Sequence, residues 1–176
     1  MFQFAKRWLA VVVCSALCLT SAGAMTVAGA AQAKDPKNDP MQKELYSYSL
    51  SMDKIQKMAE ITKNMDAYQK AHPEVAKDTG TANDDAKDIE DAAKKIETKA
   101  PEMAAMIRKA GMTPREYVTC MFTYMQAYFM VSMKRAGQIP DYSKAEGVVS
   151  PANLKFVEDH FTELEKIEQG MPHSSE

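Results

Sequence analysis

Cysteine is scarce in this sequence of 176 residues, and its placement excludes a fold that depends on disulfide bonds. The chain has 3 cysteines, of which Cys14 and Cys18 lie in an apolar stretch near the N-terminus that we expect to be removed. Only Cys120 would then remain, so no internal disulfide could form even in an oxidising compartment. Because Cys120 lies in a strongly apolar segment, we expect a buried and unreactive thiol.

The sequence also lacks the motifs that indicate an enzyme or a metal protein. Its 3 histidines are scattered and have neither zinc-binding nor haem-attachment spacing. Phosphate-binding glycine loops and a nucleophile elbow are absent, and the acidic segment 78–85 lacks the spacing of a calcium loop. We therefore predict a protein that is not an enzyme, with no catalytic residue, no cofactor and no metal ligand.

Charge of one sign does not predominate in the chain. Lysine and arginine total 22 against 24 aspartates and glutamates, which gives a net charge of −2. A protein that binds nucleic acid needs a concentrated basic face. The sequence therefore predicts no nucleic-acid partner.

The first 33 residues have the layout of a secretory signal peptide. Lys6 and Arg7 precede an apolar stretch from Trp8 to Leu19, and small residues then lead to Ala31-Gln32-Ala33. This order is typical of a signal with an A-x-A cleavage site. We expect cleavage after Ala33, with an earlier cut after Ala24 or an uncleaved anchor as alternatives. The sequence predicts a periplasmic or secreted protein.

Helical signals dominate the chain after this segment. We predict an all-α fold, a small bundle of about five helices around a central apolar helix over residues of about 114–136. The expected organisation is a disordered linker over 34–44, one helical domain over 45–170 and a disordered tail over 171–176. In the domain, residues 45–50 form an extended lead-in or the first turns of the first helix, and the second helix lies at the edge of the bundle. The helices cover about 52–71, 84–98, 101–110, 114–136 and 151–168.

The helix over 114–136 carries the clearest signals. Thr113 and Glu116 form a capping box at its start. No charge occurs from Tyr117 to Met133, so we expect a helix that is buried on most sides, with Phe122 fully buried. This uncharged stretch reaches the lower limit for a membrane span. Its tyrosines and threonines favour a core helix instead, and we expect no span after signal cleavage.

Methionine is the one residue type that is unusually abundant, with 14 in the chain. Thioethers are soft ligands that suit Cu(I), but methionine also fills gaps in helical cores, and we predict the second role. The alternative is a binder of a soft metal, Cu(I), or of a small apolar ligand. Its candidate ligand face on the central helix comprises Met121, Tyr124, Met125 and Tyr128. A third sulfur would have to come from another helix, for example from Met58, Met65 or Met106.

Two short segments carry a resemblance to known proteins. Residues 111–117 and 150–156, within a region of about 101–168, resemble a pattern in small exported bacterial proteins of unknown function. The resemblance implies an exported bacterial protein and brings no activity or site residue. We predict a non-enzymatic binding protein or a structural protein of the envelope, whose partner is an unknown protein or a small molecule.

Overall fold

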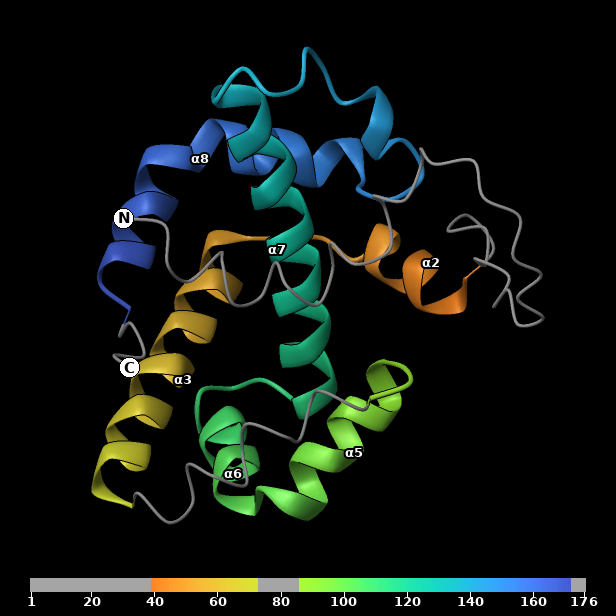
Figure 1. Cartoon of the computed structure of the whole chain (residues 1–176). Coiled ribbons are helices and arrows are strands. Elements are labelled where there is room, and N and C mark those ends of the chain that lie inside the picture. The colour runs from red at the N-terminus through yellow and green to blue at the C-terminus, as the bar shows by residue number, and fades with distance from the viewer. Residues whose placement is uncertain (1–38, 73–85, 172–176) are drawn as a thin grey trace, which may run out of the picture. The chain divides into compact units, whose positions relative to one another are not determined.

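The computed structural model describes residues 39–72 and 86–171, and in these ranges the chain is helical without a β-strand (Figure 1). The predicted all-α class is thus confirmed for the described residues, although they form six α-helices rather than five. The signal segment, residues 34–38, the loop over 73–85 and the chain after Met171 lie outside these ranges. The helices are α2 (Pro40–Ser47), α3 (Met52–Ala71), α5 (Ile89–Lys99), α6 (Pro101–Lys109), α7 (Pro114–Arg135) and α8 (Pro151–Gln169), with a 3-10 turn over Ser143–Ala145.

Side-chain caps set the start of three of the predicted helices. Ser51, Thr113 and Ser150 each accept a hydrogen bond from the backbone N–H three residues later, at 3.5, 3.1 and 3.2 Å. Each hydroxyl satisfies a donor that has no partner inside the helix. Gly111 follows α6 with φ of +79°, a conformation that favours glycine. These local signals explain why α3, α6, α7 and α8 begin and end close to the predicted positions.

The prediction of a disordered linker over 34–44 is wrong for residues 40–44, which belong to α2. The Asp39 side chain accepts a hydrogen bond from the Met41 N–H at 2.9 Å, and Pro40 occupies the first turn. Leu45 is buried, and its carbonyl accepts a hydrogen bond from the Thr123 hydroxyl of α7 at 3.4 Å. A short helix of this kind is stabilised mainly by such packing, which the polar sequence before it does not reveal.

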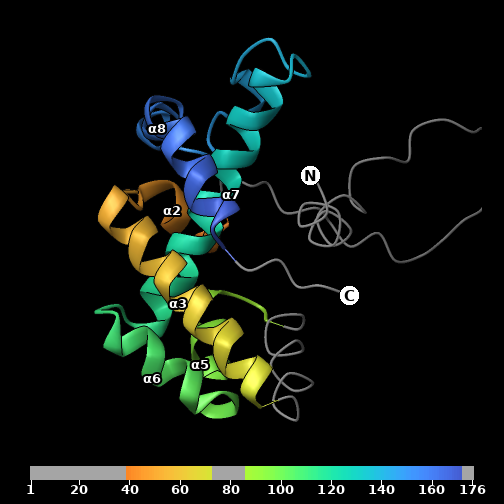
Figure 2. The same cartoon turned by 90° about the vertical axis from the view of Figure 1, so that its left-hand side faces the viewer.

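Helix α7 occupies the centre of the described fold, since it contacts α2, α3, α5, α6 and α8 (Figures 1 and 2). The helix α5 was expected at the edge, but it packs along α7 and buries Ile89, Ala92, Ala93 and Ile96. The small Ala92 and Ala93 allow the two backbones to approach closely. A thin apolar face is therefore enough to bury this helix.

The side of α7 that faces the core is not the side of Phe122, which we expected to be buried. Its core side carries mostly small side chains, including Cys120, Thr123, Ala127 and Val131. Small side chains let neighbouring helices pack against α7 at short distance. The prediction that Phe122 is fully buried is therefore wrong, because Phe122 is only partly buried at the edge of the core.

A buried amide joins α8 to the segment between α2 and α3. Asn153 is 2% exposed. Its carbonyl oxygen accepts a hydrogen bond from the Leu50 N–H at 3.0 Å, and its amide nitrogen donates to the Tyr48 carbonyl at 2.7 Å. The extended residues 48–51 have no partner strand among the described residues, so this side chain supplies hydrogen bonds that a strand would otherwise supply.

Candidate functional site

The predicted ligand face on α7 is divided between two sides of the helix, and its tyrosines turn inward. Tyr124 is 3% exposed, and its hydroxyl donates to Glu168 Oε1 at 2.9 Å. Burial raises the pKa of this phenol, and the Glu168 carboxylate raises it further. The Tyr128 ring stacks on Phe161, with ring centroids 5.2 Å apart and planes 5° apart. Both tyrosines thus serve the packing of α7 against α8.

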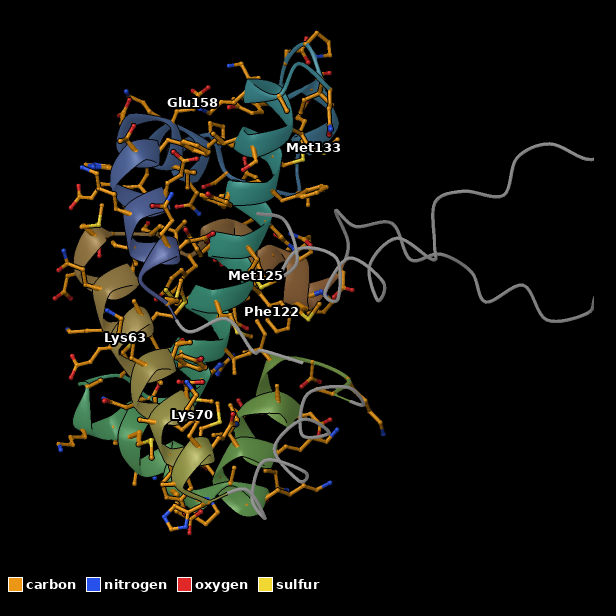
Figure 3. All side chains as sticks on the ribbon, turned by 60° about the vertical axis from the view of Figure 1, so that its left-hand side comes forward. Lys63, Lys70, Phe122, Met125, Met133 and Glu158 are labelled. Carbon is orange, nitrogen blue, oxygen red and sulfur yellow. The ribbon has the colours of Figure 1, made fainter. Side chains whose placement is uncertain are left out.

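The two methionines of that face are instead partly exposed, with Met121 at the edge of the core and Met125 on the side of α7 that turns away from it. Together with neighbouring residues they form a row, here called the outer stripe, that comprises Met121, Phe122, Met125, Phe129 and Met133. Phe129 is 45% exposed and the other four are partly exposed. Figure 3 labels three of these five side chains along α7. The same face is covered nearer the start of the helix, where Val118 is 1% exposed, and Met121 and Phe122 also pack against the core. The outer stripe is therefore an apolar helix face that the described fold leaves partly uncovered, most of all at Phe129.

Charged side chains lie at both ends of α7, and those at the C-terminal end contact α8. At the N-terminal end of α7, Arg115 ion-pairs with Glu44 at 3.0 Å and with Glu90 at 3.4 Å. At the C-terminal end, Lys134 ion-pairs with one carboxylate of α8 at 2.8 Å, and the Arg135 guanidinium lies 4.2 Å from the centre of an aromatic ring. Among these groups the first end has one negative charge in excess and the second end has one positive charge in excess. The stripe itself is thus uncharged, and the two ends of α7 carry excess charge of opposite sign.

The uncharged length of α7 raised the alternative of a membrane span. Among the described residues, no helix combines the length and the apolar character that crossing a membrane requires. Thr119 and Thr123 of α7 are buried on the core side, and the Thr119 hydroxyl donates to the Arg115 carbonyl at 2.8 Å. A hydroxyl that bonds back to its own helix can be buried at small cost.

The methionines contribute to the core mainly from its edge, since Met41, Met52, Met65, Met103, Met121 and Met130 pack against it while partly exposed. Of the 12 methionines in the described residues, only Met58 and Met112 are buried, and the other ten are partly exposed. Isoleucine, leucine, valine and alanine make up most of the fully buried core. The flexible, unbranched methionines lie at its boundary, where they cover the core and still reach the surface.

Two cavities can be described, and neither is lined by a residue of α7. The larger, of about 430 Å³, is an open groove between α3 and α8 with Glu60, Lys63, Glu163 and Lys166 on its walls. The smaller, of about 10 Å³, lies between α3 and α6 and is lined by Met65, Tyr68, Gln69, Ala100, Glu102, Met103 and Met106. The ligand pocket considered along Met121, Tyr124, Met125 and Tyr128 therefore coincides with neither cavity.

The titratable groups of the described residues form no recognisable catalytic cluster. Cys120 is fully buried, and burial raises the pKa of its thiol to about 11, which keeps it protonated at neutral pH. His160 and Glu163 lie 3.8 Å apart as an exposed pair on one turn of α8. Within the described ranges, no group of three or more His, Cys, Asp or Glu residues is placed to hold a metal ion.

Comparison with known proteins identifies no relative of the chain. No protein-family model matches it, and neither a curated protein nor a solved structure is significantly similar to it. The resemblance over residues of about 101–168 to small exported bacterial proteins stays a prediction. The functional argument consequently depends on the geometry of this chain alone.

Proposed function

We propose that the protein is an exported, non-enzymatic binding protein whose docking surface is the outer stripe of α7. The observation that carries this proposal is the 45% exposure of Phe129 on a helix face without charge. Contiguous exposed apolar side chains are typical of surfaces that bind a partner. Methionines beside the phenylalanines suit such a surface, because their side chains can adapt to the shape of the partner.

The signal-peptide layout of residues 1–33 supports export. After cleavage the protein would act in the periplasm or outside the cell. A single buried thiol fits that setting, since Cys120 offers no accessible sulfur to an oxidising environment.

The occupant that fits the stripe is one apolar helical segment of a partner protein. The outer stripe from Met121 to Met133 is about 20 Å long at 1.5 Å per residue, and a helix is about 10 Å wide. The resulting area of about 200 Å² is far below the roughly 800 Å² that each side contributes to a standard stable interface. The stripe is thus the right size for a single docked helix and too small to hold a second folded copy by itself.

The charges at the ends of α7 indicate the direction of the docked helix. Helices favour acidic residues in the first turn and basic residues in the last turn. A partner helix that runs antiparallel to α7 would bring its basic end to Glu44 and Glu90 and its acidic end to Lys134 and Arg135. Such complementarity sets orientation and specificity.

A designed peptide tests this function directly. The probe is a fluorescently labelled 17-residue helix of leucine and alanine with glutamates in its first turn and lysines in its last turn. Fluorescence anisotropy should show saturable binding to the protein. Phe129→Glu should weaken binding at least about tenfold, because it places a charge at the centre of the contact. Ala105→Glu adds the same charge at an exposed position of α6 and should leave binding unchanged.

Two results would count against this function. If the peptide does not bind, or if Phe129→Glu and Ala105→Glu weaken it equally, the outer stripe is not the docking surface. If sedimentation of the protein alone shows a dimer that Phe129→Glu dissociates, the occupant is a second copy and not a partner helix.

A further inference from the structure

A cluster of three methionines lies between α3 and α6. One of the three is far from the other two in the sequence, so the sequence alone does not reveal the cluster. Met103 and Met106 are three residues apart on α6 and share one face of that helix. Met65 comes from α3, which packs against α6. All three side chains line the same cavity of about 10 Å³ and all three are partly exposed. We call Met65, Met103 and Met106 the methionine triad.

The cavity inside the triad has the size of a single small occupant. A volume of about 10–15 Å³ is roughly what one water molecule needs. A buried water also needs two to four polar partners, whereas Met65, Ala100, Met103 and Met106 give this cavity a mainly apolar lining. An occupant held by sulfur matches the lining better than a water does.

The donor atoms at this cavity select one class of metal ion. Thioethers are soft ligands that bind Cu(I) and bind hard ions such as Mg²⁺ or Ca²⁺ poorly. No thiolate lines the cavity, so the donor set that zinc prefers is missing there. Tyr68 and Glu102 also line the cavity, and an aromatic ring and a carboxylate both attract a monovalent cation.

We propose that Met65, Met103 and Met106 form a Cu(I)-binding site with three thioether ligands. The site is independent of the docking function proposed for α7. It also differs from the face of the central helix that the sequence suggested for copper. Met121 and Met125 both belong to the outer stripe, and neither lines a described cavity, so α7 provides two thioethers without a cavity beside them.

Competition against a calibrated Cu(I) chelator under anaerobic, reducing conditions tests the proposal on the purified full chain. The wild type should withdraw one equivalent of Cu(I) from the chelator. The variant Met65→Leu/Met103→Leu/Met106→Leu should bind at least a hundredfold more weakly, because leucine keeps the size of the side chain and removes the sulfur. The matched control Met121→Leu/Met125→Leu removes two other partly exposed thioethers and should bind as the wild type does.

A second measurement covers the case in which the triple variant does not fold. Ag(I), a diamagnetic soft ion, is titrated into wild-type protein labelled with ¹³C at the methionine methyl groups. The methyl signals of Met65, Met103 and Met106 should shift together and saturate at one equivalent. Shifts spread over all methionines, no saturable uptake of Cu(I), or equal affinity in the triple variant and the control would overturn the proposal.

Discussion

Replacing Asn153 by alanine should lower the free energy of unfolding by about 2–5 kcal/mol. The amide is 2% exposed and bonds to the backbone of Leu50 and of Tyr48. Its removal leaves a buried N–H and a carbonyl without partners, and each such group costs about 1–3 kcal/mol. Because stability of a domain this size is about 5–15 kcal/mol, a large part of the margin would be lost. Chemical denaturation monitored by circular dichroism would measure the change.

Two further variants separate hydrogen bonding from packing at this position. Asn153→Leu nearly preserves the volume and removes both hydrogen bonds, so it should be almost as destabilising as Asn153→Ala. Thr162→Ala changes an exposed position of the same helix and should alter stability by less than about 0.5 kcal/mol. Wild-type stability in Asn153→Leu would show that residues 48–51 do not depend on this amide.

A glutamate on the core side of α7 should destabilise the protein strongly, whereas a glutamate on the outer stripe should change its stability little. Ala127 is 0% exposed on the core side of the helix, whereas Met125 belongs to the outer stripe. Ala127→Glu buries an unpaired charge and overfills the core, so it should cost more than about 3 kcal/mol and could prevent folding. Met125→Glu should change stability by less than about 1 kcal/mol.

The comparison is controlled internally, since both variants introduce the same side chain into the middle of the same helix. Thermal denaturation would measure both. Equal destabilisation by the two variants, or a larger loss in Met125→Glu, would mean that α7 does not have the rotation described here.

Local chemistry made most helix positions predictable. Ser51, Thr113 and Ser150 carry hydroxyls that are favoured at a helix start, and Pro114 and Pro151 follow two of them. Helix α2 has a similar signal in Asp39-Pro40, but its helix is short and depends on burial of Leu45. Such tertiary stabilisation leaves no mark in the local sequence.

The rotation of α7 could not be predicted in the same way. The helix is apolar around most of its circumference, so periodicity singles out no core face. Which face is buried depends on how closely other helices can approach it. Cys120, Thr123 and Ala127 are small and allow a close approach, so the face that carries them is buried. The large Phe122 and Phe129, which transfer energies alone would bury first, are displaced toward the surface.

The methionine triad likewise could not be predicted from the sequence alone. The pair Met103 and Met106 is visible as an i,i+3 spacing, whereas the sequence suggested Met65 and Met106 only as a third ligand for the methionines of the central helix. Only the packing of α3 on α6 brings Met65 to that pair. Sequence spacing reveals donors that share a helix, whereas a site between helices depends on the fold.

Residue-by-residue oxidation of the methionines by hydrogen peroxide, followed by mass spectrometry, tests the central claim that the outer stripe is a docking surface. Met125 and Met133 should oxidise several times faster than the buried Met58 and Met112, because accessibility controls the reaction. The designed peptide should slow the oxidation of Met125 and Met133 and leave the oxidation rate of Met171, just after the end of α8, unchanged. Equal rates for stripe and buried methionines, or stripe rates that the peptide does not alter, would contradict the account.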